Sequence, residues 1–100
     1  MSRRLSFAAL SVLHAVASGG AYGFDIIAST DLPSGTVYPA LGRLERDGYV
    51  RSEWEAAAVA QRDKRPPRRY YRVTAAGSRV LNEELSRYRA LMLVPARGRA

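Results

Sequence analysis

The spacing of hydrophobic residues along this 100-residue chain predicts helices first and strands afterwards. From Ser6 to Ser18, apolar side chains recur every three or four residues, as they do along one face of a helix. Ser6 is suited to cap this helix, and Gly19-Gly20 to end it. A shorter helix is predicted from about Tyr22 to Ser29, and a third from Thr36 to Asp47.

After the third helix the pattern changes to strict alternation, which is typical of half-buried strands. Tyr49 to Glu55 is the first such segment, and Trp54 falls on its apolar face, so we expect Trp54 in the core. Arg69 to Val73 is the second strand. Residues 56–68 contain a Pro-Pro pair and are predicted to be a long loop at the tip of an antiparallel ribbon.

The last predicted helix runs from Ala75 to about Leu93, with Thr74 as its N-cap and an end before Pro95. Three helices, a two-stranded ribbon and a further helix are the order of a winged helix-turn-helix with a C-terminal extension. The predicted fold class is therefore mainly α with a small antiparallel β-ribbon.

The charge balance limits the partners that this chain can have. Its net charge is +7 and its pI about 10.6, which suits nucleic acid or an anionic membrane surface. The chain has no cysteine, which excludes disulfides and thiolate metal sites and fits a reducing cytoplasm. No apolar run approaches the roughly 20 residues that span a bilayer. The first twenty residues partly resemble a secretory signal, but Ser11 and His14 interrupt their apolar stretch, so we expect a cytoplasmic protein.

The third helix has two distinct faces when its residues are projected at 100° each. One face is apolar and predicted to be buried: Val37, Leu41 and Leu44, with Ala40 beside them. The opposite face is slim and basic: Pro39, Gly42 and Arg46, flanked by Tyr38 and Arg43. A helix that enters the major groove needs such a face, although exposed arginines are often merely solvated. With Thr36 as N-cap, Pro39 would fall in the first turn, where its missing N–H costs little, and Gly35 would precede the helix.

The ribbon tip is the second basic region. Six basic residues and one acid lie between Arg62 and Arg72, a density that suits contact with phosphates, although a disordered basic loop is the competing interpretation. The candidate DNA contacts in this region are Lys64, Arg65, Arg68 and Arg69.

A third candidate surface lies on the terminal helices. Leucine, tyrosine and methionine side chains on the last helix follow a four-three-four spacing that suits packing against another helix. We expect this seam to form a dimer interface with part of the first helix, through Leu10, His14, Leu81, Leu85, Tyr88 and Met92.

The segments SGTVYPALGRLERDGYVRSEWE and RPPRRYYRVTAAG, together with LSFAALSVL and AYGFDI, resemble the PadR family of bacterial transcriptional regulators. The resemblance covers roughly residues 5–92. It implies a winged helix-turn-helix whose C-terminal helix forms a two-fold dimer on a pseudo-palindromic operator. It also implies repression of stress, detoxification or efflux genes, with release by a small aromatic or drug-like ligand in several members. The implied DNA contacts are Thr36, Tyr38, Pro39, Arg68 and Arg69.

These expectations divide the chain into a DNA-binding domain (1–74), a dimerisation helix (75–94) and a loose tail (95–100). An enzyme is not expected, because the sequence shows no phosphate loop, metal-ligand spacing or facing carboxylate pair. No cofactor or metal is predicted. Two alternatives stay open: a helical adaptor whose basic ribbon binds an acidic protein, and an architectural DNA-binding protein without sequence preference.

Overall fold

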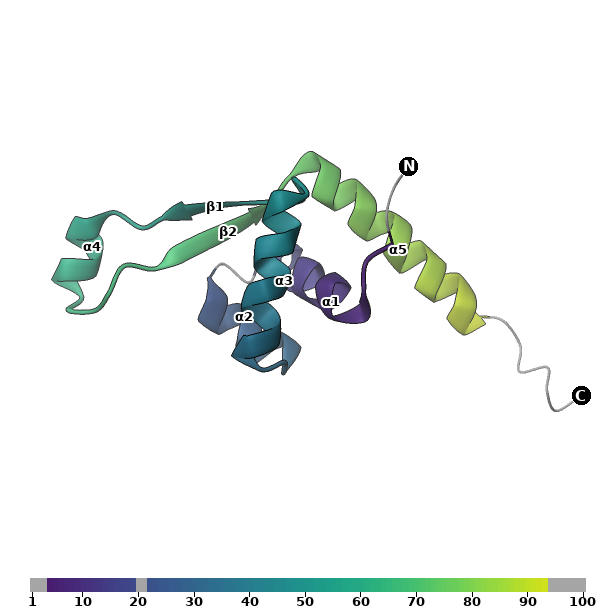
Figure 1. Ribbon diagram of the computed structural model, residues 1–100, viewed down its shortest axis with the longest axis horizontal. Helices are drawn as coiled ribbons and strands as arrows, with labels where there is room; N and C mark the ends of the chain where they lie inside the picture. The colour runs from purple at the N-terminus through teal and green to yellow at the C-terminus, as the bar shows by residue number, and fades with distance from the viewer. Residues whose placement is uncertain (1–3, 20–21, 94–100) are drawn as a thin grey trace, which may run out of the picture.

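The computed structural model describes residues 4–19 and 22–93 (Figure 1). Three helices form a compact body, from which a β-ribbon and a long helix project in opposite directions (Figure 1). The elements in chain order are α1 (Phe7–Ala17), α2 (Gly23–Thr30), α3 (Ser34–Arg46), β1 (Val50–Trp54), α4 (Ala57–Arg62), β2 (Arg69–Val73) and α5 (Ala75–Leu93). The predicted order of helices and strands is confirmed, and α4 is an addition to it.

The core lies between α1, α2 and α3. It contains the apolar face predicted for α3, and its largest fully buried side chains are Val12, Leu13, Ile26, Val37, Leu41, Leu44 and Val50. Ser6 caps α1 as predicted, since its Oγ accepts a hydrogen bond from the Ala9 N–H at 3.1 Å. Burial of these side chains fixes the orientation of α3 against the body and leaves its opposite face to solvent.

The predicted start of α3 was wrong. The helix begins at Ser34, and the N–H groups of Thr36 and Val37 both donate to the carbonyl of Pro33, the N-cap residue. Thr36 therefore lies inside the first turn, and Gly35 belongs to the helix. Pro39 lies in the helix interior, where it lacks the N–H that would have reached the Gly35 carbonyl, at a cost of about 3 kcal/mol relative to alanine.

β1 and β2 form an antiparallel ribbon in which Val50 pairs with Val73 and Trp54 with Arg69. The ribbon and its tip, residues 50–73, we call the wing. Its inner end packs on the core through Val50 and Val73. The prediction that Trp54 is buried was wrong: its side chain, on the last residue of β1, is 64% exposed.

The wing tip is not the irregular loop that was predicted. It contains α4, which follows from the run of alanines there, since alanine has the highest helix propensity. Ala60 is buried within this tip, and the carbonyl of Ala60 accepts a hydrogen bond from the Arg65 N–H at 3.1 Å. The tip is therefore a small folded unit.

The start of α5 is fixed against the body. Thr74 is its N-cap, as predicted: Thr74 Oγ1 accepts from the Gly77 N–H at 3.0 Å and donates to the Gly48 carbonyl at 2.6 Å. A side chain at Gly77 would collide with the backbone carbonyl of Tyr49, so this close approach requires glycine. From there α5 extends away from the wing (Figure 1). The expected tail, residues 95–100, lies outside the described residues.

Candidate nucleic-acid interface

The exposed surface of α3 is as slim as the sequence predicted. Its outer face consists of Tyr38, Pro39, Gly42, Arg43 and Arg46, all exposed. Apart from its chain neighbours and the backbone of its own helix, no atom lies within 4 Å of the position that a Cβ at Gly42 would take, so Gly42 faces open space rather than a packed neighbour. Among the described residues, neither Arg43 nor Arg46 takes part in an ion pair. Their guanidinium groups are available to an anionic partner.

Tyr38 is positioned by a glycine on α2. A side chain at Gly23 would collide with the Tyr38 ring and hydroxyl, so the absence of one lets the ring lie against the start of α2. Tyr38 remains half exposed beside the outer face. Sequence reasoning missed Gly23, because the contact joins residues fifteen positions apart.

A polar cluster connects the end of α3 to the wing. Ser52 Oγ donates to Glu45 Oε2 at 2.6 Å, and Arg69 Nε donates to Ser52 Oγ at 2.9 Å. Arg69 also forms an ion pair with Glu45 at 3.3 Å. Arg69 is thus held beside α3 as well as being one of the predicted DNA contacts, so the wing and α3 have a defined relative position.

A carboxylate organises the wing tip. The Arg65 guanidinium donates two hydrogen bonds to Glu55, at 2.6 and 2.8 Å, and the Arg68 N–H and the Tyr70 hydroxyl donate to the same carboxylate. These donors, Arg65 first, lower the pKa of Glu55 from 4.5 to about 2. The guanidinium of Arg65, predicted to contact DNA, is occupied by Glu55 instead.

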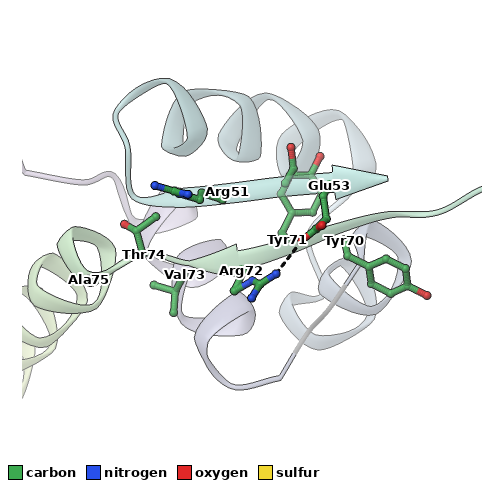
Figure 2. A pocket seen from close by; sticks show the side chains of 9 residues that line it. Arg51, Glu53, Tyr70, Tyr71, Arg72, Val73, Thr74 and Ala75 are labelled. Carbon is green, nitrogen blue, oxygen red and sulfur yellow. Dashed lines mark hydrogen bonds and ion pairs between the residues drawn. The ribbon is translucent and has the colours of Figure 1, made fainter. Parts of the chain in front are cut away.

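The remaining wing cations lie in different surroundings along the wing. The Arg68 guanidinium stacks on the Tyr22 ring, 4.3 Å from its centre, and Lys64 is exposed at the tip with a positive φ of 56°. Arg51 lies directly across from Arg72 on the ribbon, and both line a cavity of about 610 Å³ (Figure 2). Glu53 accepts a hydrogen bond from Arg72 at 2.7 Å, which offsets the repulsion between the two arginines (Figure 2).

The predicted dimer residues fall into two groups. Leu10 and Leu81 are 5% and 7% exposed and belong to the core of this chain, and Leu85 packs against that core. His14, Tyr88 and Met92 are exposed. Sequence reasoning missed two neighbours, Phe7 and Leu91, which complete an apolar end face: Phe7, Tyr88, Leu91 and Met92. The Phe7 and Tyr88 rings pack edge to face, with their centres 6.5 Å apart.

The part of the chain that the structure describes holds no group of three or more His, Asp or Glu side chains arranged to bind a metal ion. Within the same residues, no helix combines the length and the apolar character needed to cross a bilayer.

Comparison with known proteins identifies the family. The sequence profile of the transcriptional regulator PadR-like family matches residues 12–83, which include the second half of α1, all of α2 to α4, both strands and the first half of α5. This chain belongs to the PadR-like family. It is accordingly a DNA-binding transcriptional regulator and not an enzyme, and the resemblance found in its motifs is confirmed. A search of proteins with curated functions gave no significant match.

Solved structures support this assignment. The chain is similar to a PadR family regulator from Eggerthella lenta at 32% identity, with a TM-score of 0.68, covering 84% of this chain and 73% of that one. A PadR-like transcription factor from Bacteroides fragilis matches at 28% identity and a TM-score of 0.70, covering 83% of this chain and 81% of that one. BpsR of Bordetella bronchiseptica, whose DNA binding is regulated by 6-hydroxynicotinic acid, shares the fold at 21% identity and a TM-score of 0.73, covering 89% of this chain and 63% of that one.

Proposed function

We propose that this PadR-like regulator acts as a homodimeric repressor and places the outer face of α3 in the major groove of its operator. The observation that carries the proposal is this face itself. Gly42 at its centre allows close approach, and Arg43 and Arg46 offer guanidinium groups that can reach base edges and phosphates. Thr36, Tyr38 and Pro39, nearer the start of α3, complete the proposed contact.

The wing contributes the second contact. Lys64, Arg68 and Arg69 lie on or near its tip, and a ribbon tip can follow the phosphates into a minor groove. The hydrogen bonds and ion pairs of Glu55 and Glu45 hold the wing in a defined shape without DNA. Less conformational entropy is therefore lost when it binds.

The apolar end face supports dimerisation. Phe7, Leu91 and Met92 are 69%, 66% and 83% exposed, an unusual grouping of large apolar side chains on a small protein. We assign residues 75–94 to the dimerisation helix and 1–74 to the DNA-binding domain. A two-fold dimer would present two α3 helices about one DNA turn apart, which requires a pseudo-palindromic operator.

Stress, detoxification or efflux genes are the proposed targets, and the cytoplasm the proposed location. Regulation of BpsR by a small aromatic acid supports the proposal that an aromatic or drug-like ligand releases this protein from DNA.

The experiment that tests the proposal is DNase I footprinting on the DNA upstream of the protein's own gene, with the dimer mass measured in parallel. We expect protection of one pseudo-palindromic site by a dimer, with affinity falling steeply as salt increases. Uniform protection along the fragment would indicate an architectural protein instead. An absence of binding at low salt would favour the adaptor interpretation.

A further inference from the structure

Three large aromatic side chains are exposed around one groove near α3. Phe24 on α2, Tyr38 on α3 and Trp54 on β1 are 69%, 50% and 64% exposed, although they come from three separate elements. Between them lies a groove of about 280 Å³, which we call the aromatic groove. It is lined by Tyr22, Gly23, Phe24, Tyr38, Trp54, Pro67, Arg68, Arg69 and Tyr71.

The groove has a definite place in the fold. One wall is the start of α2 and of α3, and the other is the inner face of the wing, beneath which α2 lies in Figure 1. Half-burial at this site raises the pKa of the Tyr71 hydroxyl. Aromatic side chains of this size are normally covered in a monomeric protein, so a grouped and exposed set indicates a partner surface.

The cations of the groove show which partner fits. The Arg68 guanidinium lies over the Tyr22 ring and, among the described residues, is in no ion pair. The Arg69 guanidinium lies 5.6 Å from the centre of the Trp54 ring. A strip of rings with guanidinium groups on its wing side suits a partner with apolar flat surfaces and a regular negative charge. Deoxyribose and phosphate have this combination.

We propose that the aromatic groove holds the sugar–phosphate backbone strand that separates the two DNA grooves. The inference rests on the proposed placement of α3 in the major groove and of the wing tip in the adjacent minor groove. A single backbone strand lies between a major groove and its neighbouring minor groove, so this strand must cross the gap between α3 and the wing. The aromatic groove occupies that gap.

The proposal gives the lining residues different roles. Trp54 and Phe24 pack against sugars, so they add affinity through apolar burial and without ionic contact. Arg68 contacts the phosphate, so it adds affinity that depends on salt. Neither Trp54 nor Phe24 was recognised as a DNA contact from the sequence.

The test uses the full-length protein and its footprinted operator duplex. Trp54 is the only tryptophan, so its fluorescence reports on the groove directly. We expect Trp54 emission to change in proportion to bound operator. Trp54→Ala and Phe24→Ala should each weaken binding about tenfold at every salt concentration, leaving the slope of log affinity against log salt unchanged. Trp54→Phe, which keeps a ring, should stay within about twofold of the wild type.

Arg68→Ala should instead reduce the salt slope by about 0.9 for each phosphate that the variant no longer neutralises. Its control is Arg72→Ala, which removes the same charge from the ribbon at a position that does not line the aromatic groove and should leave the slope nearly unchanged. Operator binding with unaltered Trp54 emission and full affinity in Trp54→Ala would overturn this inference while leaving the proposed function intact. The inference would also be overturned if a small aromatic acid quenched the fluorescence of Trp54 and operator DNA did not displace that acid from the protein. A wild-type protein that binds no DNA would overturn both proposals.

Discussion

Replacement of Gly42 by leucine should stabilise this protein while impairing DNA binding. Glycine inside a helix is about 1 kcal/mol less favourable than alanine, and leucine is close to alanine. Apart from its chain neighbours and the backbone of its own helix, no atom lies within 4 Å of a Cβ added at Gly42, so the added side chain starts in open space and nothing there opposes this gain. For a domain of this size, about 1 kcal/mol raises the melting temperature by roughly 4–8 °C.

DNA binding should change in the opposite direction. A leucine at the centre of the outer face would hold α3 away from the bases and prevent at least one contact by Arg43 or Arg46. A good base contact contributes about 1–3 kcal/mol, so operator affinity should fall roughly tenfold or more. Gly42→Ala should give most of the stability gain with a smaller loss of affinity.

Thermal unfolding followed by circular dichroism and operator titration by fluorescence anisotropy measure the two effects on the same preparations. A Gly42→Leu variant that gains stability and keeps wild-type affinity would refute the placement of this face against DNA. A variant that loses stability would show that Gly42 is packed against something, contrary to the described structure.

Three other substitutions test the wing tip, the apolar end face and the start of α5. Glu55→Gln should lower the melting temperature most above pH 5. The pKa of Glu55 in the folded protein, about 2, lies below its ordinary value of 4.5, so the stabilisation by the ionised carboxylate is complete above pH 4.5 and is lost as the pH falls towards 2. The melting temperatures of variant and wild type should therefore converge near pH 2, and an equal difference at all pH values would contradict this. Leu91→Glu should yield monomers by light scattering with the helical circular dichroism signal retained, because Leu91 is exposed in the single chain; a dimer of unchanged mass would exclude the apolar end face as the interface. Gly77→Ala should destabilise the fold, in contrast to Gly42→Ala, because the added carbon collides with the Tyr49 carbonyl; a higher melting temperature would disprove that close approach.

Local sequence patterns were sufficient to predict most of the elements. The three-to-four spacing in α1 and the alternation in β1 and β2 reflect which side faces the core, and this is a local property. Patterns could not show where an element leaves the core. Trp54 continues the alternation that begins at Val50, yet only the inner end of the ribbon is covered.

The candidate site was predicted less completely, because several of its features depend on partners distant in sequence. The faces of α3 followed from its helical period, whereas the attachment of Arg65 to Glu55 and of Arg69 to Glu45 appears only when the wing folds. For the same reason, the four-three-four spacing on α5 did not show that Leu81 is buried within the chain whereas Met92 is exposed. The aromatic groove gathers three elements and has no local sequence pattern.

Methylation interference on the operator tests the placement of α3 in the major groove, because dimethyl sulfate modifies guanine N7 in that groove. We predict two clusters of interfering guanines, about one helical turn apart on one face of the duplex. Gly42→Leu should weaken binding to the unmodified operator and reduce the additional penalty that these methylations impose. Strong binding that is insensitive to guanine N7 methylation throughout a guanine-containing site would contradict the placement of α3 in the major groove.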